Sequence, residues 1–94
     1  MLKFEWDDRK NKTNIKKHGI SFEEASSVFF DEDALIISDE SHSQKEERFV
    51  LIGFSYKANL LVVCHCYREK DSTIRIISAR KANRQESEEY AKKL

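Results

Sequence analysis

Four side chains suited to chemistry on an anionic group fall on three predicted strands in the second half of the chain: Arg48, His65, Tyr67 and Arg75. An imidazole titrates near neutral pH, so it can give or take a proton during a reaction. A guanidinium keeps its charge and presents a planar fork of donors that matches phosphate oxygens. The combination is typical of a site that binds an anion and transfers protons at it.

Further cations follow these four along the chain. The stretch "TIRIISARKANRQE", residues 73–86, runs from a β-branched strand directly into basic residues. Segment 68–84 carries six basic residues against two acidic ones, whereas segment 31–47 carries seven acidic residues against one lysine. The formal net charge of zero therefore conceals a segregated surface. We expect the basic segment to form the wall of an anion-receiving cleft, through Arg68, Arg80, Lys81 and Arg84.

Three late strands have to bring the candidates together. Runs rich in β-branched and aromatic residues predict strands at 48–54, 60–68 and 73–79, and their short connections predict an antiparallel meander. With turns at 56–59 and 68–72, Val50 and Arg75 lie on either side of His65, and Arg48 lies across from Tyr67. All four candidates then share the face that points away from the helices. The core face would comprise Phe49, Leu51, Val62, Cys64, Cys66, Ile74 and Ile76.

Helix signals precede and follow the meander. The first helix begins at Asp7 or Asp8 and extends to about residue 18, where a glycine allows a left-handed end. Ser21 and Glu24 have the spacing of a capping box and begin a second helix. The same spacing at positions 83 and 86 begins a terminal helix that reaches Tyr90.

The remaining segments complete the predicted fold. Strands at 1–6 and 34–38 and a polar loop at 39–47 give the order strand, two helices, four strands, helix. This order predicts an α+β fold, with an antiparallel sheet of four to five strands, two N-terminal helices packed on one face and a C-terminal helix. A chain of 94 residues accommodates one such domain with one core, spanning 1–94.

Several classes of protein are excluded by composition. The longest apolar stretch, "LLVVC", is far too short for a membrane span and no leader precedes the domain, so we expect a cytoplasmic protein. Cys64 and Cys66 stand two positions apart on one strand, where they cannot bond each other, and reduced thiols are expected. Strand alternation sends His65 away from both thiols, which predicts no metal site and no cofactor.

Four colinear stretches resemble one family over nearly the whole chain: "FEWDDRKNKTNIKKHGISFEEA", "EERFVLIGFS", "LLVVCHCYRE" and "IRIISARKANRQESEEY". They resemble the BrnT family, the toxin half of a bacterial type II toxin–antitoxin system. The resemblance implies a RelE-like fold, ribonuclease activity and neutralisation by a BrnA-type antitoxin with a ribbon–helix–helix DNA-binding domain. It also implies that operator DNA is bound only through the toxin–antitoxin complex, which represses its own operon.

The chemistry of cutting RNA without a cofactor suggests a role for each candidate residue, although the family motif by itself assigns none of them. The 2′-hydroxyl must lose a proton, the scissile phosphate must accept negative charge, and the leaving 5′-oxygen must gain a proton. We expect His65 to transfer a proton and Arg48 and Arg75 to stabilise the charge. Tyr67 would stack on an unpaired base or orient a phosphate. The RNA strand would be held by charge, through Arg68, Arg80, Lys81 and Arg84.

Alternatives remain open at each of these residues. His65 can equally be a buried histidine with a satisfied hydrogen bond, and Tyr67 can be a cross-strand packing partner. Arg80 and Arg84 can pair with nearby glutamates on the surface. For the whole domain, the alternatives are a module that holds its antitoxin without cutting RNA, and a nucleic-acid-binding protein without chemistry.

Overall fold

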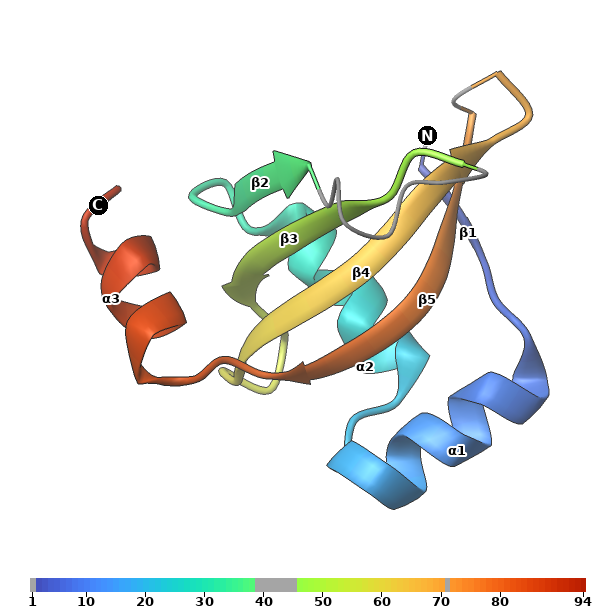
Figure 1. The fold of residues 1–94 in the computed structure, drawn as a ribbon, viewed down its shortest axis with the longest axis horizontal. Helices are drawn as coiled ribbons and strands as arrows, with labels where there is room; N and C mark the ends of the chain where they lie inside the picture. Colours follow the sequence, from blue (N-terminus) through green and yellow to red (C-terminus); the bar gives the residue numbers. More distant parts are fainter. Residues whose placement is uncertain (1, 39–45, 71) are drawn as a thin grey trace.

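The computed structural model describes residues 2–38, 46–70 and 72–94 (Figure 1). Its helices are α1 (Asp8–His18), α2 (Phe22–Ser27) and α3 (Arg84–Ala91), with a 3-10 turn η1 (Val28–Phe30) after α2. Its strands are β1 (Lys3–Glu5), β2 (Leu35–Ser38), β3 (Phe49–Phe54), β4 (Leu60–Arg68) and β5 (Thr73–Lys81). The predicted α+β fold is confirmed. The predicted loop at 39–47 lies outside the described residues, apart from its last two positions.

The described strands form one sheet in the order β1-β5-β4-β3-β2. The late strands make the predicted antiparallel meander, and β2 pairs antiparallel with β3 at one edge. At the other edge β1 runs parallel to β5, with Phe4 opposite Ile74, so the sheet is mixed rather than antiparallel throughout. α2 lies across one face, which we call the inner face, and α1 lies beside β5; the side of the sheet opposite α2 is the outer face (Figure 1).

The main core lies between the inner face and the helices. It consists of Ile20, Phe22, Ala25, Val28, Leu51, Leu61, Val63, Ile76 and Ala79. A smaller cluster on the outer face joins Tyr90 of α3 to Ile52 and Val62. α3 therefore covers one end of the outer face, at the side where the C-terminus lies (Figure 1).

The register between β3 and β4 differs from the predicted one by one residue. The strands are joined by residues 55–59, in which Ser55 N donates to Asn59 O at 2.9 Å and Ala58 adopts a left-handed φ of 61°. This loop is longer than the predicted turn at 56–59. As a result Phe49, rather than Val50, lies opposite His65.

The register between β4 and β5 also differs from the prediction, and a bulge interrupts it. His65 pairs with Ile76 while Cys64 pairs with Ser78, so β5 contains one extra residue at this point. A one-residue shift in register reverses the direction of every side chain on a strand. Each side chain of β4 therefore points to the face opposite the predicted one. The predicted core residues that face outward instead are Val62, Cys64 and Cys66. The predictions for Leu51 and Ile76 are confirmed.

α1 is anchored to the sheet by a buried amide. The Asn14 Nδ2 group donates to the carbonyls of Ile20 and Ala79 at 2.8 Å each, and Asn14 Oδ1 accepts from Ala79 N at 3.2 Å. One side chain thereby satisfies both backbone groups of Ala79, which lies beyond the residues of β5 that pair with β1. The amide allows a helix with few apolar residues to pack on the sheet.

Glu24 holds the β3–β4 loop from α2. The predicted cap is present, since Ser21 Oγ accepts from Glu24 N at 3.0 Å. The Glu24 carboxylate is directed elsewhere: its Oε2 accepts from Ser55 Oγ at 2.6 Å and from Asn59 Nδ2 at 2.8 Å, in a buried site. Both ends of the loop at 55–59 are thus fixed to one carboxylate oxygen.

Removing this carboxylate should destabilise the fold. Glu24→Ala leaves Ser55 Oγ and Asn59 Nδ2 without their acceptor in a buried site. We expect the free energy of unfolding, measured by urea denaturation, to fall by about 2–4 kcal/mol. The matched control is Glu23→Ala in the same helix turn, whose exposed side chain should change stability by less than about 0.5 kcal/mol. Equal losses in the two variants would assign the effect to the helix instead of the loop contact.

Candidate functional site

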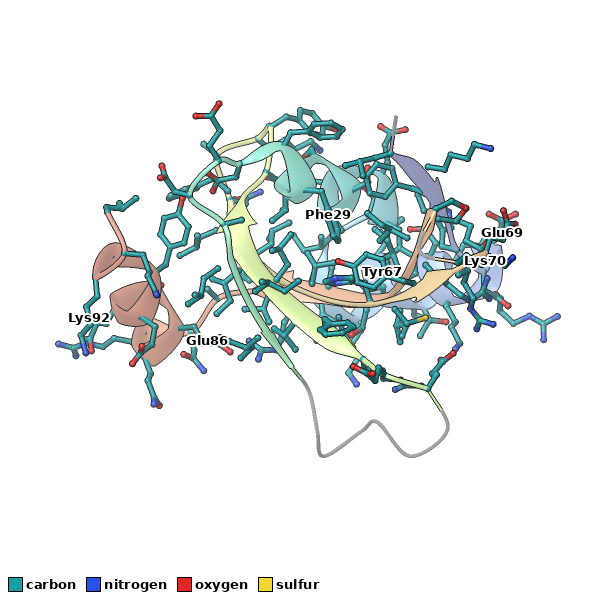
Figure 2. All side chains as sticks on the ribbon, turned by 90° about the horizontal axis from the view of Figure 1, so that it is seen from above. Phe29, Tyr67, Glu69, Lys70, Glu86 and Lys92 are labelled. Carbon is teal, nitrogen blue, oxygen red and sulfur yellow. The ribbon has the colours of Figure 1, made fainter. Side chains whose placement is uncertain are left out.

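The four candidate side chains divide between the two faces of the sheet. His65 and Tyr67 lie on the inner face, where their rings are 5.4 Å apart and the His65 ring is 4.7 Å from that of Phe29. Figure 2 shows Phe29 and Tyr67 on the same side of the sheet. Arg48 and Arg75 belong to the outer face. The prediction that all four share one surface is therefore wrong, because it depended on the register of β4.

His65 is enclosed by aromatic rings. Its side chain has 0% exposure and contacts the rings of Phe29, Phe49 and Tyr67. The Nδ1 atom is 3.3 Å from the carbonyl oxygen of Val63, and the described residues supply no hydrogen-bond partner for Nε2. Burial lowers the pKa of His65, although the contact with the Val63 carbonyl acts in the opposite direction. The ring is therefore neutral at physiological pH.

Arg48 and Arg80 line a shallow pocket on the outer face. The pocket has a volume of about 240 Å³ and is completed by Val50, Val62, Cys64, Ile77 and Ser78. Its walls come from β3, β4 and β5, so the sheet itself forms its floor. A hollow with two guanidiniums and an apolar floor can receive a phosphate together with part of a sugar or base.

Arg75 lies across the outer face from Arg48. Arg75 pairs with Cys66 in the neighbouring strand, and Arg48 immediately precedes Phe49, the partner of His65. The two arginines therefore flank Cys66 at a separation of about two strand spacings, roughly 10 Å. On its other side, Arg75 Nη1 donates to Glu5 Oε2 of β1 at 2.6 Å. Two guanidiniums and one carboxylate thus share one stretch of surface.

The thiol between these arginines is held in its neutral form. Burial raises the pKa of Cys66, and the negative charge of Glu46 acts in the same direction, while Arg68 opposes both. Arg68 itself pairs with Glu46 at 3.2 Å. Cys66 therefore contributes a small apolar group to the outer face.

The other predicted substrate-binding arginines also have carboxylate partners. Arg80 makes two hydrogen bonds of 2.8 Å with Glu86, which raise the pKa of Arg80 and lower that of Glu86. Glu86 lies where α3 meets the end of β5, and Figure 2 shows it beside the sheet. Arg84 pairs with Glu88 at 3.5 Å on the exposed side of α3. Both arginines thus form the surface pairs that were the alternative to an RNA contact, and Lys81 is exposed at the end of β5.

A second group of cations lies on α1, outside the predicted cleft. It comprises Arg9, Lys10, Lys12, Lys16 and Lys17. All five are exposed, and none forms an ion pair with any residue in the described part of the chain. Positions 9, 12 and 16 share the side of the helix opposite the buried Asn14. The signal was present in the sequence as five basic residues within nine positions, but acids at 7 and 8 precede them.

Two further classes of feature are absent from the described residues. Within 2–38, 46–70 and 72–94, no three His, Cys, Asp or Glu side chains are grouped so as to hold a metal ion. None of the described helices is long and apolar enough to cross a membrane.

Comparison with known families defines the class of the protein. Residues 6–86 match a family model described as "Ribonuclease toxin, BrnT, of type II toxin-antitoxin system". The class is therefore that of the ribonuclease toxins of type II toxin–antitoxin systems. Since the match covers most of the domain, the chain belongs to the BrnT family. Among curated proteins, none matches this chain.

A solved structure shares the fold. It is the crystal structure of the Brucella abortus ribonuclease toxin BrnT, with a TM-score of 0.67 and 24% sequence identity. The alignment covers 89% of this chain and 100% of that chain. At this level of identity the likeness establishes that both chains adopt the same α+β arrangement.

The buried imidazole should make the fold sensitive to acid. The folded state holds His65 neutral, while the unfolded chain takes up a proton below about pH 6.5. The unfolded state then binds more protons, so the free energy of unfolding falls as the pH drops through that value. From near pH 7.5 to near pH 5.5 we expect His65 to contribute a loss of about 1 kcal/mol, measured by urea denaturation. His65→Leu should remove this contribution, and an unchanged pH dependence in that variant would contradict the assignment.

Proposed function

We propose that this chain is a metal-independent endoribonuclease toxin that cuts RNA with side chains on the outer face of its sheet. Membership of the ribonuclease toxin family supports the activity. The single observation that carries the site is that Arg48 and Arg75 share the face of the sheet opposite α2. The partner is a BrnA-type ribbon–helix–helix antitoxin, and operator DNA is bound only through the antitoxin in the complex.

In this proposal the guanidiniums of Arg48 and Arg75 stabilise the charge that develops on the scissile phosphate. Their planar donors match phosphate oxygens, and their charge does not vary with pH. Glu5 is the proton acceptor for the 2′-hydroxyl, because one of its oxygens is bonded to Arg75 while the carboxylate remains half-exposed on the same surface. Solvent water supplies the proton that the leaving 5′-oxygen takes up as the bond between phosphorus and that oxygen breaks. The carboxylate of Glu86 is less suitable, since both of its oxygens are bonded to Arg80.

His65 and Tyr67 take supporting roles in this proposal. The imidazole has no exposure from which to reach RNA, and it packs among the rings that support the end of β4. Tyr67 lines a different pocket together with Glu46, Glu47 and Phe49. Two carboxylates in that lining repel a polyanion, so the pocket does not suit a nucleotide.

The RNA strand is held mainly by charge in this proposal. The residues that would hold the strand are Arg68, Arg80, Lys81 and Arg84, and the three arginines must exchange a carboxylate for a phosphate. The exposed Arg84–Glu88 pair contributes little to stability, so its exchange costs little, whereas the bidentate and partly buried Arg80–Glu86 pair costs more to break. The cations of α1 add charge that forms no ion pair within the described part of the chain, although Arg9 and Lys10 lie near the carboxylate of Asp7.

Substitution of the outer-face arginines should abolish cleavage while leaving the fold intact. We expect Arg48→Gln and Arg75→Gln each to reduce the rate of RNA cleavage at least about a hundredfold, because each removes a preorganised charge donor. The measurement is single-turnover cleavage of a labelled single-stranded RNA by the free toxin, with and without EDTA. Lys57→Gln, which removes one cation from the β3–β4 loop, is the matched control and should cleave at the wild-type rate.

Two results of that experiment would contradict the proposal. Loss of wild-type cleavage in EDTA would mean that the reaction needs a metal ion. Full activity in both arginine variants would move the site away from the outer face. Growth of cells expressing each variant without antitoxin provides an independent readout, since inactive variants should not arrest growth.

The cations of α1 should contribute to RNA affinity. Replacing Arg9, Lys12 and Lys16 by Gln should weaken binding of a single-stranded RNA and reduce the slope of log affinity against log salt by about 2, because each neutralised phosphate contributes about 0.7 to that slope. Binding is measured by fluorescence anisotropy in EDTA at several salt concentrations, with a 2′-O-methylated strand to prevent cleavage. The matched control replaces Lys57, Lys92 and Lys93, which removes the same charge elsewhere. An equal decrease in slope for both triple variants would show that only net charge matters.

A further inference from the structure

An aromatic groove lies at the end of β3, at the edge of the molecule where α2, η1 and the β3–β4 loop meet. It has a volume of about 490 Å³ and is lined by Ser27, Phe30, Asp31, Phe54, Ser55 and Tyr56. Phe30 is 68% exposed and Tyr56 is 64% exposed. Two aromatic side chains that are this exposed and line one hollow are typical of a surface that a partner covers.

The polar groups that line the groove already have partners. Tyr56 N donates to Ser27 Oγ at 3.0 Å, and Ser27 Oγ donates to Glu24 O at 2.6 Å. The Asp31 Oδ2 atom accepts from Phe54 N at 2.8 Å and from Tyr90 Oη at 2.6 Å. A partner can therefore cover these groups with apolar atoms and leave their hydrogen bonds in place. The groove also has a fixed shape, because the loop carrying Tyr56 is held by Glu24.

Charge at the groove is predominantly negative. Burial by itself raises the pKa of Asp31, but hydrogen bonds from Tyr90 and Phe54 lower it further than burial raises it, so the carboxylate stays ionised. Glu32 and Asp33 follow it in the chain and are exposed. The cation nearby is Lys57, whose Nζ atom lies 5.8 Å from the centre of the Tyr56 ring. An RNA strand would be repelled here, and so would a second copy carrying the same acids.

We propose that the antitoxin covers this groove with a segment that inserts an apolar side chain between Phe30 and Tyr56 and sets basic residues beside Glu32 and Asp33. The assignment depends on the proposed function only for the existence of the antitoxin. In this proposal RNA binds the outer face, which carries the arginines, and the antitoxin binds the acidic, aromatic groove at the end of β3. The antitoxin can then hold the toxin without competing directly for the phosphate site.

The test measures binding of the antitoxin to toxin variants. The probe is the protein encoded in the reading frame adjoining that of this chain, with affinity measured by isothermal titration calorimetry. Phe30→Ser combined with Tyr56→Ser should weaken binding by about 30-fold or more, as expected for the loss of interface anchors. The free variant should cleave RNA at the wild-type rate. Ile15→Ser, which removes an exposed apolar side chain from α1, is the matched control and should bind normally.

A charge variant tests the second half of the proposal. Glu32→Lys combined with Asp33→Lys should weaken antitoxin binding at low salt, and the difference should shrink as salt screens it. The matched control is Glu88→Lys combined with Glu89→Lys on α3, which changes net charge equally. Equal effects in the two variants would overturn the assignment of basic residues to this edge.

The other outcomes are distinct. If the Phe30 and Tyr56 variant binds the antitoxin with unchanged affinity, the groove is not the antitoxin site, and the proposed function is unaffected. Weakened RNA binding in that variant would assign the rings to base stacking instead. Conversion of a dimeric free toxin into a monomer would assign them to self-association. A wild-type toxin that cuts RNA but does not bind the adjoining protein would contradict both the partner and its site.

Discussion

The buried carboxylate of Glu24 is the contact on which the arrangement of the sheet depends. By accepting hydrogen bonds from Ser55 and Asn59, it fixes both ends of the loop between β3 and β4. The length of that loop sets which residue of β4 lies opposite each residue of β3. A shift of one residue would turn His65 outward and Val62, Cys64 and Cys66 inward, so a single polar contact helps to decide which side chains reach solvent.

That register gives the two faces different chemistry. The inner face buries a neutral imidazole among aromatic rings and is covered by α2 and η1. The outer face presents arginines whose charges are partly balanced by glutamates from β1 and α3. Such pairing keeps a basic surface compatible with a chain of zero net charge and leaves guanidiniums that can exchange partners when a phosphate arrives. The groove beside Phe30 is acidic and would repel an anionic substrate, so we infer that the substrate and the protein partner bind different parts of the surface.

Local signals predicted the elements well, and long-range contacts account for what they missed. Caps at Asp7, Ser21 and Asn83 and the short connections of the meander are local features, and all are present. The facing of β4 could not be read from its sequence because both of its faces are apolar: Leu61 and Val63 alternate with Val62 and Cys64. The spacing of Ser21 and Glu24 matched a capping box, but the carboxylate contacts a loop about thirty residues away, which no local rule anticipates. The parallel pairing of β1 with β5 likewise leaves no trace in the short β1 segment.

The sequence therefore predicted the facing of two of the four candidate side chains. Arg48 and Arg75 were expected on the face away from the helices and are found there, because the positions of β3 and β5 were correct. His65 and Tyr67 were predicted to share that face because the side chains of β4 were predicted to point in the wrong direction. The most direct test of the account is a crystal structure of this protein with a single-stranded RNA whose 2′-hydroxyls are methylated. The account predicts a phosphate within about 3 Å of a guanidinium of Arg48 or Arg75. A strand bound instead over Phe49 and Tyr67, on the side of the sheet that holds His65, would contradict it.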